Sequence, residues 1–290
     1  MTVTIGVIGS INLDLVASGV PLPRPGETIT GAQFAQHPGG KGANQALASR
    51  RLGAEVKMAG CVGGDSLAES ALKLLRQDGV DVQGVMSEID AATGVALIAV
   101  SDTGENQIIV ASGANARVSE SDVAALPACD SLLLQLEVSV SAITAAGNRA
   151  EASGERLMVN LAPAKEVPDQ IFHQASVLIV NEIEAEFYGD KLHQGDAMVI
   201  VTLGRQGAVA YKNGKELTRV RAFDVEAVDT TGAGDTFCGA LAVALAEAQP
   251  LDDALKFASA AAALAVTRPG AQPSLPWRAQ VDAFLTEKSF

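Results

Sequence analysis

Short apolar runs that suit β-strands alternate with segments of helical periodicity along this chain, and this alternation constrains the fold more than any other feature. The runs are apolar at consecutive positions, as strands covered on both faces of a sheet are. Strands that alternate with helices favour a parallel sheet with helices on both sides, so we predict an α/β fold. The predicted strands are Val3–Ile8, Ser131–Leu136, Leu157–Asn160, Val177–Asn181 and Met198–Leu203. The predicted helices are Ala43–Leu52, Ser66–Gln77, Ser139–Ala152, Gly232–Ala248, Leu251–Thr267 and Trp277–Glu287.

Local signals mark the ends of two of these elements. Ser66 and Glu69 form a capping-box pattern at the start of one helix, and Gly79 follows its end. Asn213-Gly214 is typical of a tight hairpin, which we place near the core.

Two segments depart from the alternation and predict a small β-sheet beside the main body. Pro21, Pro23 and Pro25 exclude a helix and favour extended chain. Val95–Val100 and Gln107–Val110 flank a turn and predict a hairpin. We predict one domain over residues 1–290, in which insertions at about 13–38 and 93–112 form a β-sheet lid over a cleft.

Charge and composition exclude several classes of function. A net charge of −13 argues against nucleic acid or an anionic membrane surface as the main partner. No run approaches the roughly 18 apolar residues of a membrane span, and the N-terminus reads as a strand and not as a signal peptide. Cys61, Cys129 and Cys238 are scattered and odd in number, which is typical of a reducing compartment. We expect a soluble, cytoplasmic protein.

The segment Asp229–Phe237 combines an anion site with a carboxylate. Gly232 and Gly234 flank Ala233 where a helix is predicted to begin, and Asp235 follows directly. A helix N-terminus offers unpaired N–H groups to an anion, and glycine lets a phosphate approach them. A carboxylate beside that phosphate makes chemical sense as a base for the attacking hydroxyl. The alternative, taken alone, is ordinary helix capping.

A second glycine-rich segment, Pro38–Ala46, opens the first predicted helix. Its glycines allow the backbone to approach a ligand, and Asn44 can both donate and accept hydrogen bonds. It is not a Walker A loop, because Lys41 is followed by glycine and not by Ser or Thr. The dinucleotide fingerprint also fails in the later segment, where Phe237 stands at the position of the third glycine, and this counts against an NAD enzyme.

Polar side chains follow several predicted strands at their carboxyl ends, where open α/β sheets place ligands. Asn12 and Asp14 suit the binding of a hydroxyl group, or alternatively a turn that uses their own backbone bonds. Glu137 follows a second strand. Asn181 and Glu184 follow a third, where they suit Mg²⁺ held through waters or, alternatively, a solvated first helical turn.

These motifs occur together in the order of the ribokinase-like sugar kinases, which the chain resembles over nearly its whole length. The Gly39–Ala46 and Asp229–Phe237 segments are highly specific in combination. The tail Ala261–Trp277 also resembles this family. The further matching segments are Gly9–Asp14, Gly60–Asp65, Thr93–Ala96 and Asn181–Glu184.

The resemblance implies a role for each matched residue. Asp235 matches the catalytic base, and the backbone of Gly232, Ala233 and Gly234 matches the anion hole for the transferred phosphoryl group. The sugar pocket is matched by Asn12, Asp14, Gly40, Lys41, Asn44 and Glu137. The ATP and Mg²⁺ side is matched by Asn181, Glu184, Thr202, Gly204, Gly207, Gly234 and Ser259.

The resemblance also implies a monovalent-cation site, usually for K⁺, beside the anion hole. Asp229 and Thr231 match one half, and Ala265, Arg268, Gly270 and Ser274 match the other, chiefly through backbone oxygens. It further implies a homodimer joined through the lid sheets. One departure concerns the crossover after Glu184: only about residues 188–197 are available for a helix, so we predict a truncated helix or an irregular loop there.

The function implied by the resemblance is ATP-dependent phosphorylation of D-ribose at O5. The alternative within enzymes is a kinase for another sugar or a nucleoside, such as deoxyribose or fructose. A sugar-binding regulator without catalysis is the alternative from another class, and the intact Asp235 with its glycine pair argues against it.

Overall fold

The main body of the protein is a large sheet with parallel strands at its centre. The computed structural model describes residues 2–288, and in this part of the chain a nine-stranded sheet is parallel from β11 to β5. β12 and β13 extend one edge in antiparallel orientation. In sheet order the strands are β13 (Lys215–Val220), β12 (Ala208–Lys212), β11 (Met198–Thr202), β10 (Val177–Asn181), β9 (Arg156–Asn160), β8 (Ser131–Gln135), β1 (Thr4–Ile8), β4 (Glu55–Gly63) and β5 (Asp81–Glu88).

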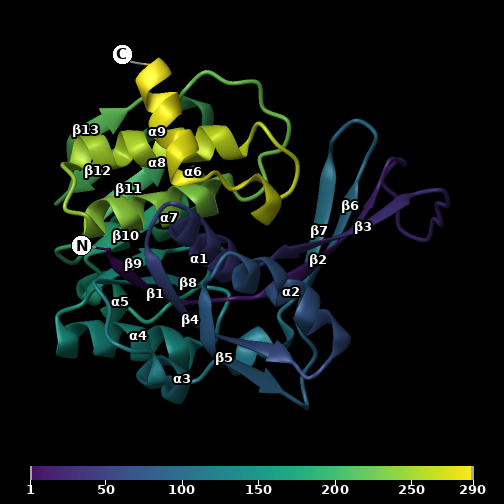
Figure 1. The fold of residues 1–290 in the computed structure, drawn as a ribbon, viewed down its shortest axis with the longest axis horizontal. Helices are drawn as coiled ribbons and strands as arrows, with labels where there is room; N and C mark the ends of the chain where they lie inside the picture. Colours follow the sequence, from purple (N-terminus) through teal and green to yellow (C-terminus); the bar gives the residue numbers. More distant parts are fainter. Residues whose placement is uncertain (1, 289–290) are drawn as a thin grey trace.

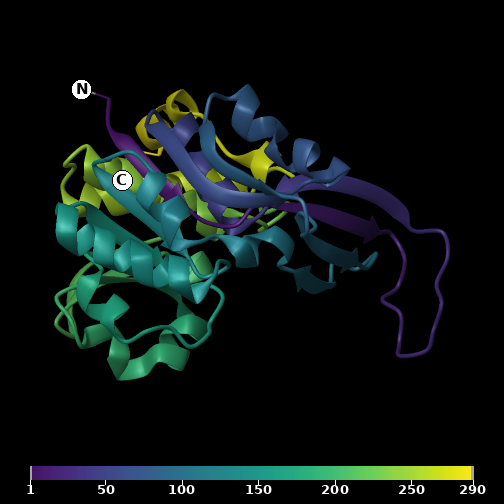
Figure 2. The ribbon, with the colours of Figure 1, turned by 90° about the horizontal axis from the view of Figure 1, so that it is seen from below.

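Helices cover both faces of this sheet, so two apolar cores form. Successive side chains of a strand point to opposite faces, and Val7 accordingly joins one core while Ile8 joins the other. Figures 1 and 2 show the two groups of helices on opposite sides of the strands. The first core includes α1 (Lys41–Arg51), α2 (Ser66–Gln77), α7 (Ala233–Ala246), α8 (Leu251–Ala265) and α9 (Arg278–Glu287). The second includes α3 (Glu120–Ala125), α4 (Val140–Ser153), α5 (Gln170–Gln174) and α6 (Glu182–Tyr188).

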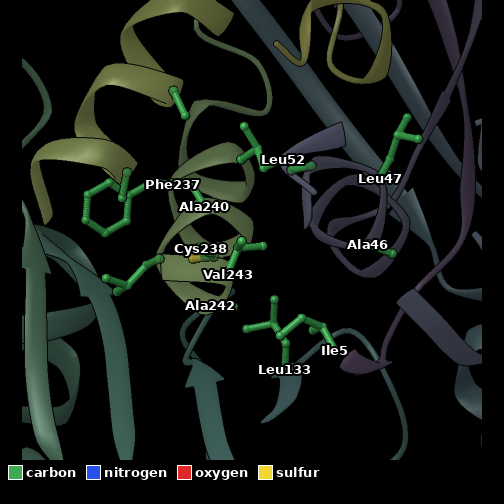
Figure 3. Packing of buried hydrophobic residues seen from close by; sticks show 14 of the residues in the cluster. Ile5, Ala46, Leu47, Leu52, Leu133, Phe237, Cys238, Ala240, Ala242 and Val243 are labelled. Carbon is green, nitrogen blue, oxygen red and sulfur yellow. The ribbon is translucent and has the colours of Figure 1, made fainter. Parts of the chain in front are cut away.

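Close packing of α1 against α7 places the two glycine-rich segments side by side. Figure 3 shows buried residues of both helices in one core, including Ala46 of α1 and Ala240 of α7. Where the two helices meet, Gly239 of α7 faces Ala48 and Ser49 of α1. A Cβ on Gly239 would lie 2.8 Å from the Cβ of Ala48, so glycine is required for this approach. Both helices begin at the carboxyl ends of the parallel strands, which brings their N-terminal turns to one site.

A small separate sheet projects from the body (Figures 1 and 2). It contains β3 (Gln33–Gly39), β2 (Asn12–Ser18), β6 (Gly94–Val100) and β7 (Asn106–Ala111), in that order. The predicted hairpin is confirmed, because β6 and β7 pair antiparallel. β2 and β6 pair in parallel, so the sheet is mixed. The loop between β2 and β3 extends furthest from the body in Figure 2.

The predicted α/β class and the five predicted core strands are confirmed, with ends shifted by one residue at most. The predicted Ser66–Glu69 capping box is wrong: Asp65 is the N-cap, and its side chain accepts hydrogen bonds from the N–H groups of Leu67 and Ala68 at 3.0 and 3.2 Å. The Asn213-Gly214 hairpin is confirmed, and both residues have positive φ.

The shortened crossover contains a seven-residue α6, Glu182–Tyr188, followed by a 3₁₀ turn at Gly189–His193. Residues 189–197 therefore carry only this short turn and irregular chain, as predicted, and the short helix α6 precedes them. β4 and β5 were not predicted as strands. β5 lies at the sheet edge and is interrupted by polar residues, and β4 carries two glycines and a lysine, so neither gives a continuous apolar run.

Candidate active site

Asp235 lies in the first turn of α7 and is 8 % exposed. Its two carboxylate oxygens accept hydrogen bonds from two neighbouring residues of α1. Asn44 Nδ2 donates to Oδ2 at 2.9 Å, and Gln45 Nε2 donates to Oδ1 at 2.9 Å. The carboxylate is therefore held from two sides in a buried position, which is unlike a solvent-exposed helix cap.

Asn44 has one unsatisfied atom in this site. Asn44 is 5 % exposed, and its Oδ1 atom is buried without a hydrogen-bond partner among the described residues. Because Nδ2 is used by Asp235, the free carbonyl oxygen requires a donor from outside the chain. A hydroxyl group of a bound sugar has this chemistry.

Asn12 is fixed by a residue that the sequence did not indicate. Asn115, in the 3₁₀ turn Gly113–Arg117, donates from Nδ2 to Asn12 Oδ1 at 2.7 Å and accepts from the N–H of Ile11 at 2.8 Å. Asn12 therefore keeps its own Nδ2 group for a ligand. A Cβ on Gly94 would lie 2.3 Å from Asn12 Oδ1, so this glycine leaves room for the amide pair.

Asp14 lies against backbone that lacks a side chain. A Cβ on Gly39 would approach Asp14 Oδ2 to 2.4 Å, so only glycine accommodates this carboxylate. Burial, followed by the negative charges of Glu137 and Asp235, raises the pKa of Asp14 to about 7. The three predicted carboxylates therefore share one electrostatic environment, as their positions after different strands suggested.

Glu137 and Lys41 complete this group. Glu137 Oε2 accepts from Ser10 Oγ at 2.6 Å and from the N–H of Lys41 at 3.3 Å. Burial alone would lower the pKa of the Lys41 ammonium, but the charges of Asp235, Glu137 and Glu184 raise it above its usual value. Lys41 is thus a cation among three carboxylates. Gly40, the N-cap of α1, has a φ of 89° and packs against the backbone of Ser10 and Asn12.

The N-terminus of α7 is partly open. Gly232 is the N-cap with a φ of 76°, which explains glycine there. The N–H of Ala233 donates to the Thr230 carbonyl at 3.2 Å, so this predicted donor of the anion hole is already engaged. Gly234 has a helical φ, and a Cβ built on it has no heavy atom within 4 Å. No contact in the described chain requires glycine at 234.

Asn181 and Glu184 form a capping box at the start of α6. Asn181 Oδ1 accepts from the N–H of Glu184 at 2.8 Å, and Glu184 Oε2 accepts from the N–H of Asn181 at 2.8 Å. Glu184 is only 7 % exposed, whereas Asn181 and Glu182 of the same turn are exposed, so only the Glu184 side chain is withdrawn from solvent. Burial raises its pKa despite the Asn181 N–H and the Lys41 charge. Thr202 pairs with Asn181 in the sheet register.

The remaining residues matched to the nucleotide side lie around the β11 end of the sheet and on α8. Gly204 and Gly207 bound a 3₁₀ turn after β11, with φ values of 51° and 101°. A Cβ on Gly207 would lie 2.0 Å from the carbonyl oxygen of Val220, so its role includes backbone packing. Ser259 lies within α8 and is 8 % exposed.

The two predicted halves of the monovalent-cation site lie together. Asp229 Oδ1 accepts from Thr231 N and Oγ1 at 2.9 and 2.6 Å, and Asp229 Oδ2 accepts from the N–H of Gly270 at 2.8 Å. Burial opposes ionisation, but these hydrogen bonds lower the pKa of Asp229. The Ala265 carbonyl accepts from the N–H of Arg268, and Ser274 Oγ donates to Ala271. The residues offer only oxygen ligands, which suits a hard cation.

Sequence reasoning missed four buried amides at this site. Asn115 contacts Asn12, and Gln45, Gln135 and Asn160 form a chain that ends at Asp235. Gln45 was visible as the residue after Asn44, and Asn160 as a polar residue ending a predicted strand. Gln135 was likewise a polar residue next to the end of a predicted strand, whereas Asn115 had no comparable signal. No grouping of three or more His, Cys, Asp and Glu residues suited to a metal occurs within residues 2–288, and no helix described there is long and apolar enough to cross a membrane.

Comparison with known proteins assigns the family. The model of the pfkB family carbohydrate kinases matches residues 4–278, and the chain belongs to this family. It is 38% identical to the ribokinase of Haemophilus influenzae, over 98% of this chain and 99% of the relative. It is 39% identical to that of Schizosaccharomyces pombe, over 97% of both.

A solved structure confirms the fold. The structure of Arabidopsis thaliana ribokinase complexed with ribose and ATP superposes with a TM-score of 0.88 at 29% identity, covering 98% of this chain and 99% of that one. The chain is therefore a sugar kinase in fold and family.

Proposed function

We propose that this protein transfers the γ-phosphoryl group of ATP to O5 of D-ribose, giving D-ribose 5-phosphate and ADP. The observation that carries the proposal is the buried Asp235 carboxylate beside the open N-terminal turn of α7. The choice of ribose as the substrate rests on the relatives named ribokinase, which are 38–39% identical to this chain. The relative solved with ribose and ATP supports the same pair of ligands.

Asp235 acts as the general base in the proposed reaction. The O5 hydroxyl donates its proton to the carboxylate as the oxygen attacks the γ-phosphorus, and the bond between that phosphorus and the ADP oxygen breaks. The open N-terminus of α7 at Gly234 stabilises the charge on the transferred group, as helix N-termini stabilise anions. Gly232 shapes this turn by its positive φ.

The sugar pocket is proposed to use the polar residues around Asp235. Asn44 offers its unsatisfied Oδ1, and Asn12 offers the amide group left free by Asn115. When ionised, Asp14 accepts a hydrogen bond from a sugar hydroxyl, while Lys41 supplies a nearby positive charge. Glu137 anchors the loop after β1 through Ser10 and lies on the same side of the pocket.

The nucleotide side is proposed to combine the α6 capping box with the turn after β11. Mg²⁺ bound to ATP neutralises phosphate charge in reactions of this class. Glu184 and Asn181 offer oxygen ligands of the kind Mg²⁺ prefers, although Glu184 Oε2 and the single side-chain oxygen of Asn181 each already accept a backbone hydrogen bond. Thr202, Gly204 and Gly207 are proposed to contact the nucleotide, with Ser259 at the adenine end.

Asp229 and its neighbours are proposed to hold K⁺. Asp229 already joins the loop before α7 to the loop at Gly270 through hydrogen bonds. A cation bound to these oxygens and to backbone carbonyls of Ala265, Arg268 and Gly270 would order the turn that carries Asp235. Thr231 and Ser274 offer further oxygens.

The small sheet is proposed to close over the sugar as a lid and to pair with a second copy. Closure excludes water, which competes with the sugar as acceptor. Apolar side chains exposed on this sheet support pairing, since Ile109 is 68% and Phe34 66% exposed. Ile108, Val110 and Leu97 of the same sheet are also about half exposed. A cytoplasmic location remains a prediction.

The experiment that tests the function measures ADP release with ATP, Mg²⁺ and K⁺ against ribose, deoxyribose, fructose, adenosine and inosine. A strong preference for ribose is expected. Turnover of another compound would keep the mechanism and change the substrate. Asp235→Asn should lower kcat by about 10²–10⁴-fold while ribose still binds by calorimetry, as expected for loss of a general base. Near wild-type kcat in this variant would refute the assignment of the base.

A further inference from the structure

A chain of buried amides connects the sheet to Asp235. Gln45 and Gln135 are fully buried, and Asn160 is 8 % exposed. Gln135 Nε2 donates to Gln45 Oε1 at 2.6 Å, and Gln45 Nε2 donates to Asp235 Oδ1 at 2.9 Å and to Asn160 Oδ1 at 3.1 Å. These residues come from the ends of β8 and β9 and from α1.

The hydrogen bonds determine which way the amides of Asn160 and Gln45 face. Asn160 Nδ2 donates to the carbonyl of Ile179 at 3.3 Å, so Asn160 Oδ1 faces Gln45. Both hydrogens of Gln45 Nε2 are then used, one by Asn160 and one by Asp235. If the Gln45 amide were flipped, its oxygen would face two acceptors, Asn160 Oδ1 and Asp235 Oδ1. Its amino group would then face Gln135 Nε2, which is itself a donor. The Gln45 amide can therefore present only a donor to Asp235.

We infer that Gln45 is a positioning residue for the base. Its amide, oriented by Gln135 and Asn160, fixes Asp235 Oδ1 from the interior and leaves Oδ2, on the side of Asn44, to receive the sugar proton. The inference rests on the proposed function, because it assumes that Asp235 is the base. Both polar atoms of the Gln45 amide are engaged by Gln135, Asn160 and Asp235, so it acts on the reaction through Asp235.

Two substitutions separate positioning from core packing. Gln45→Met keeps the length of the side chain and removes both donors. Kcat should fall roughly 10- to 100-fold, the range for loss of a hydrogen bond to a charged group, while ribose KM stays within about threefold. Gln45→Glu keeps the shape and places a second carboxyl group against Asp235. The apparent pKa of the pair then rises, so the acid limb of the kcat profile should move by at least about one pH unit toward higher pH.

Ser49→Ala is the matched control on the same helix. Ser49 is buried one turn further along α1, and its hydroxyl donates to the carbonyls of Gln45 and Gly239 at 2.8 and 3.3 Å. Neither of these acceptors is a carboxylate. The variant should lower the melting temperature and leave kcat and its pH profile unchanged.

The activity of the wild-type protein shows whether the proposed function or only the role of Gln45 is wrong. If wild-type protein phosphorylates ribose, or another sugar of the panel, the variants are compared on that sugar. Kcat of Gln45→Met equal to that of Ser49→Ala, or an unmoved acid limb in Gln45→Glu, would show that the amides serve only the core. If Gln45→Met does not fold, the isosteric Gln45→Glu decides by its pH profile. If the wild-type protein phosphorylates no sugar, the assignment of Asp235 as a base is wrong, and both proposals are overturned.

Discussion

Replacement of Gly234 by alanine should separate activity from stability, because no contact within the described chain requires this glycine. A Cβ built at 234 meets no heavy atom within 4 Å, and the residue lies in the first turn of α7. Alanine is favoured over glycine in a helix by up to about 1 kcal/mol. We expect the free energy of unfolding to stay unchanged or to rise by up to about 1 kcal/mol, equivalent to a melting temperature higher by at most about 2–4 °C.

Activity should change in the opposite direction. The open space beside Gly234 is where the transferred phosphoryl group is proposed to approach the helix N-terminus, and a methyl group would occupy it. Loss of a single donor in an oxyanion-type site lowers kcat by about 10²–10³-fold. We expect a loss of at least about 100-fold in the steady-state rate of ADP release, with ribose binding by calorimetry retained.

Gly239→Ala provides the contrasting variant in the same helix. Its Cβ would lie 2.8 Å from Ala48 Cβ and 2.8 Å from the Gln45 carbonyl oxygen, so overpacking should destabilise the fold by about 1–3 kcal/mol. Thermal unfolding of both variants checks the predicted changes in stability. If Gly234→Ala keeps kcat within about threefold of wild type, the phosphoryl group does not lie against Gly234 and the reasoning is refuted.

Three further predictions concern the sugar pocket and the cation site. The pKa of Asp14, raised to about 7, means that the folded protein holds a proton there which the unfolded chain, with a pKa near 3.8, releases. Stability of the ligand-free protein should therefore fall by a few kcal/mol as pH rises from about 4 to 7, and Asp14→Asn should reduce this dependence in denaturant titrations. Ribose affinity should rise through pH 7 as Asp14 ionises, and calorimetry that shows no such change would contradict its role. Asn115→Leu should raise ribose KM about tenfold or more with little change in kcat, because Asn12 loses its orienting donor; an unchanged KM would argue against this. Replacing K⁺ with Na⁺ should lower the rate, and equal rates in the two salts would remove support for the Asp229 site.

Much of the fold was predictable because its central strands are covered on both faces and carry continuous apolar runs. β8, β10 and β11 were found within one residue of their ends for this reason. β5 and β4 were missed because an edge position and glycines break that pattern. The N-cap of α2 was assigned to the wrong residue, since Asp65 and Ser66 both suit the role and only backbone geometry decides between them.

The sequence by itself determined the two glycine-rich helix starts and the polar residues at the strand ends, because each is a local pattern with a local physical reason. The tertiary structure alone decided which of them meet. It placed Asn44 and Gln45 against Asp235 across 190 residues of chain, and it revealed Asn115 behind Asn12. It also showed that Gly234 faces open space while Gly239 is required by packing. These distinctions depend on contacts between segments distant in sequence, and the orientation of an amide or the space beside a glycine is set only when such segments pack together.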